Sequence, residues 1–203
     1  KVVESLQRPG TNVTGVSSLS APLAAKRLEF LKEAAPLIRK VAIPFTPDDI
    51  PGKSSYSFAL EAAKKLGIEL VPYHISKERD VKATALAIKR KDVDGIVISS
   101  DSSVWANLAT YVEQAKKEKL PFAVFDKDMV EKGGLLGYGP DYFTTGEQSA
   151  FFVDKIFKGA KPADLPIENP SKLILALNLK TAEDIGFVFP KPLLLKADKV
   201  YPE

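Results

Sequence analysis

Aspartate and small hydroxyl side chains gather in a few short segments of this 203-residue chain. Asp101 precedes Ser102 and Ser103, while Asp126 and Asp141 each follow an apolar or glycine-rich run. A carboxylate can bind the ammonium group of a ligand, and hydroxyls with free backbone N–H groups at a helix start can bind a carboxylate. Aromatic side chains near these segments could pack an apolar ligand group: Trp105, Tyr56 and Tyr142. Together, these residue types indicate ligand binding.

Each of these residues also has a plainer structural interpretation. Asp101 and Asp126 stand just before predicted helices, where aspartate commonly caps the first turn. Trp105 lies at helical spacing from Leu108 and could belong to the core. In an enzyme, the two aspartates could instead form an acid/base pair, as glycoside hydrolases do with carboxylates ~5–9.5 Å apart.

Motifs that would carry catalysis are missing from the sequence. It contains no GxGxxG, phosphate loop, GxSxG or HExxH. With no cysteine and with His74 as the single histidine, disulfide scaffolds, thiolate-rich metal sites and multi-histidine mechanisms are excluded. We therefore expect no catalytic residue, no metal and no cofactor.

The charge balance argues against nucleic acid and membrane partners. The 29 basic and 26 acidic residues leave a formal charge of +3, which is too small to favour a polyanion. Apolar residues make up 45% and charged residues 27%, the composition of an ordinary globular protein. No segment approaches the ~20 apolar residues of a membrane span, so we expect no membrane insertion by this chain.

The polar segments follow short apolar runs that alternate with amphipathic stretches. The runs carry few charges, which is typical of strands covered on both faces: 41–45, 69–73, 95–99, 121–125 and 173–177. Helical spacing marks the stretches 23–34, 58–66, 81–88, 104–115 and 142–157, and a short helix begins at 181.

This strand–helix rhythm predicts an α/β fold with a doubly wound parallel sheet. Ligands bind such sheets beyond the carboxyl ends of the strands, where the polar segments lie. Residues 13–139 suffice for a complete unit, whereas 140–203 hold too few elements to close a core, and we expect them to need another sheet.

Four segments resemble ABC-transporter substrate-binding proteins, a family that includes tryptophan/tyrosine-binding lipoproteins. They are ESLQRPGTNVTGVS at 4–17, GGLLGYGPDY at 133–142, KIFKGAKPADLPIE at 155–168 and NLKTA at 178–182. The resemblance runs in the same order from one end of the chain to the other.

The resemblance implies a type I periplasmic-binding-protein clamshell, with ligand between two α/β lobes. Residues 1–15 are then the crossover from lobe 1, 16–137 form lobe 2, and 138–203 return to complete lobe 1. The chain would lack most of lobe 1, and a signal peptide would precede Lys1 in the natural protein.

In the aromatic-amino-acid binders, an Asn-Pro turn, an Asn-Ser pair, a Thr-Asp-Asn-Thr loop, a Ser-Asp pair and Gly-x-Asp-Tyr mark the site. This sequence has Thr46-Pro47, Ser54-Ser55, Ser100–Ser103, Phe125-Asp126 and Gly139–Tyr142 at those places. The acids are retained and their polar neighbours differ, which leaves aromatic amino acids, other amino acids and small carboxylates open as ligands. The expected ligand-binding residues are Thr46, Ser54, Ser55, Asp101, Ser102, Ser103, Trp105, Asp126, Asp141 and Tyr142.

By this resemblance the protein is the solute-binding component of an ABC importer, not an enzyme. We expect it to be exported, either periplasmic or anchored at the cell surface as a lipoprotein, with the transmembrane permease subunits as partners. The alternative is an extracellular ligand-sensing domain of a signalling receptor.

Overall fold

The computed structural model describes residues 2–202. The chain divides into two compact units. Unit 1 consists of Lys1–Leu19 and Pro140–Leu173, and unit 2 consists of Ser20–Gly139 and Ile174–Glu203.

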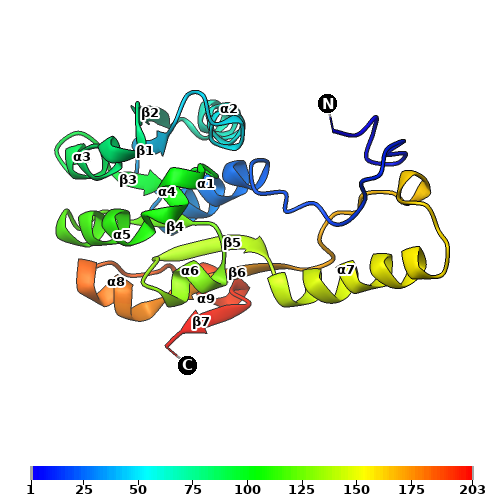
Figure 1. The fold of residues 1–203 in the computed structure, drawn as a ribbon. Coiled ribbons are helices and arrows are strands. Elements are labelled where there is room, and N and C mark those ends of the chain that lie inside the picture. Colours follow the sequence, from blue (N-terminus) through cyan, green and yellow to red (C-terminus); the bar gives the residue numbers. More distant parts are fainter. Residues whose placement is uncertain (1, 203) are drawn as a thin grey trace. The chain divides into compact units, whose positions relative to one another are not determined.

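A mostly parallel sheet forms the centre of unit 2, with its described strands in the order β2-β1-β3-β4-β5-β6-β7 (Figure 1). The strands are β1 (Lys40–Phe45), β2 (Glu69–His74), β3 (Gly95–Val97), β4 (Phe122–Val124), β5 (Leu136–Pro140), β6 (Leu173–Asn178) and β7 (Lys199–Tyr201). Neighbours from β2 to β5 pair in parallel, as do β6 and β7. The N–H of Asn178 donates to the Leu135 carbonyl at 2.9 Å and that of Asp141 to the Lys172 carbonyl at 3.1 Å, so β5 and β6 run antiparallel.

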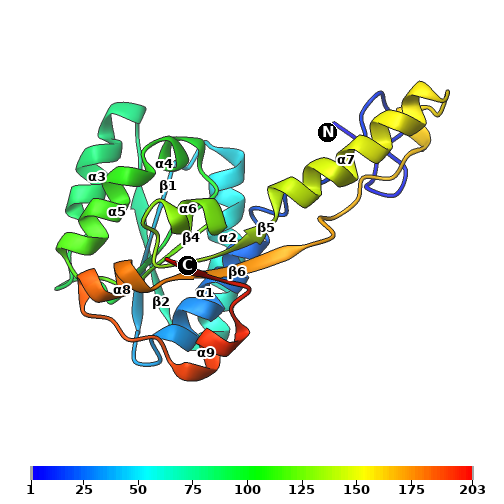
Figure 2. The ribbon, with the colours of Figure 1, turned by 90° about the horizontal axis from the view of Figure 1, so that it is seen from below.

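Helices cover both faces of this sheet (Figure 2). In unit 2 they are α1 (Leu23–Ala34), α2 (Ile50–Leu66), α3 (Val81–Ala87), α4 (Ser102–Ala106), α5 (Leu108–Lys117), α6 (Lys127–Glu131), α8 (Leu179–Ile185) and α9 (Lys191–Lys196), with a 3₁₀ turn at Glu78–Asp80. Helices α1 and α2 pack together on one face, and α5 packs against α3 and α8 on the other. Lys196 of α9 forms an ion pair of 2.6 Å with Glu33 of α1, which holds α9 beside α1.

The apolar strand runs account for this layering. Every residue of β3 and β4 is buried, because helices lie on both sides of these central strands. Gly67 and Gly186 end α2 and α8 with φ of 63° and 69°, a left-handed conformation that favours glycine. The predicted α/β fold with its doubly wound sheet is confirmed.

In unit 1, α7 (Tyr142–Phe157) matches the predicted helix at both ends, and a 3₁₀ turn follows at Pro162–Asp164. A parallel bridge joins Val16 to Glu168, and Gln148 of α7 donates to the Glu168 carboxylate at 2.8 Å. One side of α7 leaves an apolar stripe exposed, at the spacing of a helix face: Phe143, Gly146, Ala150, Val153 and Phe157.

The arrangement differs from the expected division of the chain in residues 174–203. We expected all of 138–203 to complete lobe 1 and to need a sheet from elsewhere, yet β6 and β7 extend the sheet of unit 2. The physical reason is that β6 is an apolar strand, and its open pairing partner, the edge of β5, lies within the same chain.

Candidate ligand-binding site

Three predicted site loops share one edge of the unit 2 sheet. Thr46 follows β1, Asp101 follows β3 and Asp126 follows β4, each within a few residues of the strand end. Because β1, β3 and β4 are neighbouring parallel strands, their carboxyl ends meet at the same edge.

Asp101 holds two of these loops together. Its Oδ1 accepts from the N–H groups of Ser103 at 2.8 Å and Val104 at 3.1 Å, and from the Ser103 hydroxyl. Its Oδ2 accepts from the N–H of Thr46 at 2.6 Å. Asp101 is therefore both the N-cap of α4 and a tie to the loop that follows β1.

These hydrogen bonds keep Asp101 ionised. Burial alone would raise its pKa, but the Ser103 hydroxyl and the Thr46 and Val104 N–H groups stabilise the carboxylate and lower the pKa overall. The same bonds correct one expectation: the N–H of Ser103 is engaged by Asp101, so it is not a free donor for a ligand carboxylate.

A cavity of about 370 Å³ opens beside this carboxylate, within unit 2. Two carboxylates, three hydroxyls and one methyl group line it: Asp49, Asp101, Thr46, Ser102, Ser103 and Ala106. The hydroxyls of Thr46 and Ser103 lie 3.4 Å apart. Five of the six lining residues carry a carboxylate or a hydroxyl group, and none of the six is basic.

Other predicted residues lie near this cavity with different roles. Ser55 of α2 is buried, and its hydroxyl accepts from the N–H of Ser100 at 3.2 Å, while Ser54 is half-buried on the same helix. Trp105 of α4 is 60% exposed, so the alternative that it belongs to the core is wrong. The first turn of α2 approaches Asp101 closely, since a Cβ on Gly52 would lie 2.9 Å from Asp101 Oδ2.

Asp126 is buried at the third loop, where it caps α6 by accepting from the N–H of Met129 at 2.9 Å. Burial raises its pKa, an effect that the Met129 N–H and the charge of Arg27 oppose only in part. Asp126 thus differs from Asp101, although both cap a short helix after a parallel strand.

Asp141 and Tyr142 belong to unit 1, at the start of α7. Asp141 caps this helix by accepting from the N–H of Phe143 at 3.1 Å, and its carboxylate lies 3.9 Å from the Lys172 ammonium. Tyr142 is 46% exposed.

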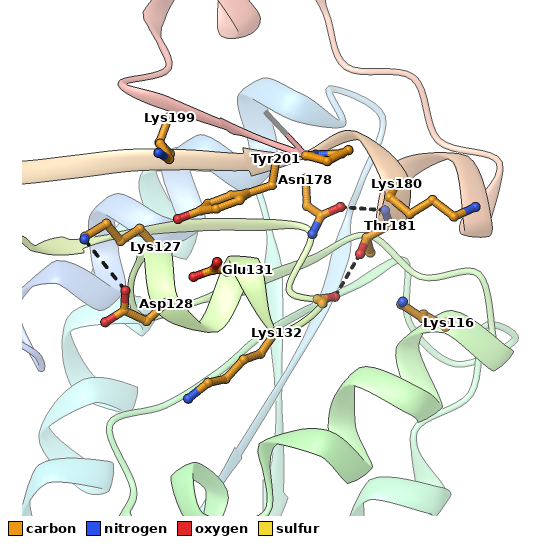
Figure 3. A pocket seen from close by; sticks show the side chains of 12 residues that line it. Lys116, Lys127, Asp128, Glu131, Lys132, Asn178, Lys180, Thr181, Lys199 and Tyr201 are labelled. Carbon is orange, nitrogen blue, oxygen red and sulfur yellow. Dashed lines mark hydrogen bonds and ion pairs between the residues drawn. The ribbon is translucent and has the colours of Figure 1, made fainter.

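A larger cavity of about 810 Å³ lies along α6, α8 and β7, and no predicted site residue lines it (Figure 3). Five lysines line it, and acids lie beside three of them: Lys127 lies 3.8 Å from Asp128, while Lys116 and Lys180 lie 3.2 Å and 2.8 Å from Asp184. Figure 3 shows Glu131 and the Tyr201 ring between the lysines. The lysines of this cavity are therefore compensated in part by acids.

Two residues that the sequence analysis missed bear on the site. Asp49 lines the smaller cavity and caps α2 by accepting from the N–H of Gly52 at 2.7 Å. Its signal is an aspartate directly before Ile50-Pro51, a common helix start. Arg27 is the second, and its signal is a charge within the apolar row formed by Leu23 and Leu31 of α1.

Within residues 2–202, no group of three or more acidic or histidine side chains could hold a metal ion. Over the same described range, every helix falls short of the length and apolarity needed to cross a membrane.

Comparisons with known proteins place this geometry in a family. The profile of ABC transporter substrate binding proteins matches residues 1–201. The "ABC domain" from Streptococcus pneumoniae in complex with L-Trp has 26% identity and a TM-score of 0.87 over 98% of this chain and 68% of that one. A conserved domain protein from Vibrio cholerae has 29% identity and a TM-score of 0.89 over 98% of this chain and 66% of that one.

A substrate-binding protein with adhesive properties from Clostridium difficile, in its ligand-free open form, shares the fold. It has 24% identity and a TM-score of 0.71, covering 94% of this chain and 63% of that one. No curated protein matches closely enough to be counted as a relative. This chain spans about two thirds of the length of the three structures named here. It belongs to the family of ABC transporter substrate-binding proteins, which bind solutes for transport and are not enzymes.

Proposed function

We propose that this protein binds a small zwitterion with an ammonium group, most simply an amino acid, and delivers it to the permease of an ABC importer. The observation that carries this proposal is the cavity of about 370 Å³ at the carboxyl edge of the sheet, which two aspartates and three hydroxyl residues line. An ammonium group brings three N–H donors and a positive charge, which suit two carboxylates and three hydroxyls.

The ten predicted site residues enter this proposal with different roles. Thr46, Ser102 and Ser103 would contact the ammonium group, and Asp101 would hold them in place and add its charge. Ser54 and Ser55 would support the α2 side of the site. Asp126 would supply a further carboxylate at the same edge, and Asp141 and Tyr142 remain proposed ligand contacts at the start of α7.

An aromatic side chain on the ligand has two supports. The relative from Streptococcus pneumoniae was solved with L-Trp, at 26% identity to this chain. The exposed Trp105 ring next to the cavity residue Ala106 offers a flat apolar surface for such a side chain. Tyr56 is less available, since it stacks on Phe45 at 4.7 Å between ring centroids.

The same family membership supports an exported protein that is periplasmic or held at the cell surface, with lipid anchoring as part of the proposal. A two-lobed clamshell would use unit 2 as one lobe and unit 1 as part of the other. In that arrangement, the exposed apolar stripe of α7 would become buried. None of the matched structures named above supports the signalling-receptor alternative.

A thermal-shift screen of the twenty amino acids, followed by calorimetric titration, tests the proposal. It is best done on the natural gene product, because the 203 residues span about two thirds of related chains. If L-tryptophan is bound, we expect N-acetyl-L-tryptophan, which lacks the ammonium charge, to lose nearly all affinity. A screen in which no amino acid raises the melting temperature would overturn the proposal.

Two neighbouring substitutions give a matched control. Asp49→Asn removes a carboxylate from the cavity but keeps an oxygen to cap α2, and we expect about tenfold weaker binding, which is about 1.4 kcal/mol. Asp48→Asn removes the same charge from an exposed position outside the cavity lining and should leave affinity unchanged. Equal losses in both variants would point to long-range charge and away from this cavity.

A further inference from the structure

Arg27 is a charged residue in the interior of unit 2. It lies on α1 between Leu23 and Leu31, one helical turn from each, and only 1% of its surface is exposed. Burying a guanidinium costs several kcal/mol unless hydrogen bonds and opposite charge compensate it. An apolar residue would suit this row better for packing alone.

The compensating contacts of Arg27 go to the chain where it enters and leaves unit 2. Its Nε donates to the Tyr138 carbonyl and its Nη2 to the Ser20 carbonyl, both at 3.0 Å. Ser20 is the first residue of unit 2, and Tyr138 precedes the last residue of its long segment, Gly139. We call the chain at Ser20 the entry passage and the chain at Tyr138 the exit passage. The Arg27 side chain therefore bonds to both passages.

Arg27 also contacts the loop that carries Asp126. The guanidinium lies over the Phe125 ring, 4.8 Å from its centroid. Strand β5 runs tightly along this loop, since a Cβ on Gly137 would lie 2.6 Å from the Asp126 carbonyl oxygen. The loop, the exit passage and the entry passage are thus packed as one cluster around Arg27.

We propose that Arg27 is a positioning residue: it locks the Ser20 and Tyr138 passages to the loop carrying Asp126 and so sets the geometry of the ligand-binding edge. The consequence for affinity rests on the function proposed above, because that function places Asp126 at the site. The locking itself does not depend on any ligand.

The charges around Asp126 define what Arg27 adds electrostatically. Asp128 of α6 raises the pKa of Asp126 and Arg27 of α1 lowers it, while Tyr201 of β7 has its own pKa raised by burial and by the surrounding carboxylates, Asp126 included. The positive charge of Arg27 opposes the effect of burial, so the pKa of Asp126 should rise further without it.

The test compares Arg27→Met with Arg27→Lys, and Lys26→Met serves as a control at an adjacent exposed position of α1. Hydrogen exchange of segments 16–22 and 134–141 reports the locking, and a carboxyl-carbon NMR titration reports the pKa of Asp126. We expect exchange about tenfold faster in both Arg27 variants, since a lysine cannot reach both carbonyls in the same geometry. The pKa of Asp126 should rise in Arg27→Met, remain near the wild-type value in Arg27→Lys, and be unchanged in Lys26→Met.

Binding of L-tryptophan to the natural gene product supplies a separate readout. If the wild type binds it, we expect about tenfold weaker binding in Arg27→Met, with a pH dependence displaced upward. The positioning role would be overturned if the folded Arg27 variants showed unchanged hydrogen exchange and an unchanged pKa of Asp126. It would also be overturned if Arg27→Met bound L-tryptophan with the affinity and the pH dependence of the wild type. If the wild type binds no amino acid, the proposed function fails, whereas exchange and titration still decide the role of Arg27. If Arg27→Met does not fold, the exchange of Arg27→Lys decides.

Discussion

Replacing Asp101 with asparagine changes one carboxylate oxygen into an NH₂ group at a position where both oxygens accept hydrogen bonds. Oδ1 receives the N–H groups of Ser103 and Val104, and Oδ2 receives that of Thr46. Whichever way the new amide is turned, its NH₂ faces an N–H donor. An Asp101→Asn protein therefore loses a bond that it cannot replace, in addition to the charge.

The size of this effect follows from the groups affected. Leaving the Thr46 N–H without its acceptor costs about 1–3 kcal/mol, and the remaining bonds to Asp101 lose the strength that the charge gave them. We expect a total near 3 kcal/mol, which corresponds to a melting temperature lower by about 6–12 °C in a unit of this size.

The pH dependence has a definite sign. The pKa of Asp101 is lowered in the folded protein, so its stabilisation is present above the unfolded-state pKa and is lost as pH falls through the folded pKa. Wild type and Asp101→Asn should therefore differ most near neutral pH and converge in acid.

Urea denaturation at neutral and acidic pH measures both effects. The reasoning would be refuted if Asp101→Asn matched the wild type within about 0.5 kcal/mol at neutral pH, the range expected of a surface substitution. A stability difference that persisted unchanged in acid would show that packing, not the carboxylate, is responsible.

Four further substitutions test separate parts of unit 2 and unit 1. Asp126→Asn should raise the melting temperature at neutral pH, because burial makes the ionised carboxyl group costly and asparagine can still cap α6. This gain should vanish as the pH falls through the folded-state pKa of Asp126 towards its unfolded-state pKa. A loss of stability at neutral pH would contradict the prediction. Gly52→Ala should lower the melting temperature, although alanine is better than glycine in a helix by about 1 kcal/mol, because the new Cβ would lie 2.9 Å from Asp101 Oδ2. Gly146→Ala should raise the melting temperature, since nothing lies within 4 Å of its new Cβ. Equal shifts in the two variants would argue against crowding at Gly52. Tyr111→Phe should leave the free energy of unfolding unchanged or slightly higher in chemical denaturation, because the buried Tyr111 hydroxyl has no hydrogen-bond partner among the described residues. A decrease above about 1 kcal/mol would show that this hydroxyl does have a partner.

Elements with strong local signals were predicted well from the sequence. The helix 142–157 is α7 to the residue, and the apolar run 69–73 became β2 with one residue added. The glycines at 67 and 186 end helices with positive φ, as their place after an apolar stripe indicates.

Elements that depend on distant partners were missed. No helix or strand was predicted within residues 190–202, where α9 and β7 lie. Strand β7 is short and only half-buried, and its pairing with β6 defines it, which no local pattern reveals. For the short helix α6, the sequence predicted the cap at Asp126 but not the extent of the helix, because five residues carry too little periodicity to be recognised.

The candidate site shows the same limit at the level of single residues. Asp101 and Asp126 carry the same local signal, an aspartate between a parallel strand and a helix, and both are N-caps. Their pKa values nevertheless move in opposite directions. At Asp101 the Ser103 hydroxyl and the N–H of Thr46, 55 positions away, together outweigh burial, whereas burial dominates at Asp126. Substituting each by asparagine should therefore change stability with opposite signs. On this reasoning, Asp101 stabilises the fold at the candidate site, whereas Asp126 carries an ionisable group at a cost in stability. Such a cost is expected of Asp126 if it contacts a ligand, as proposed.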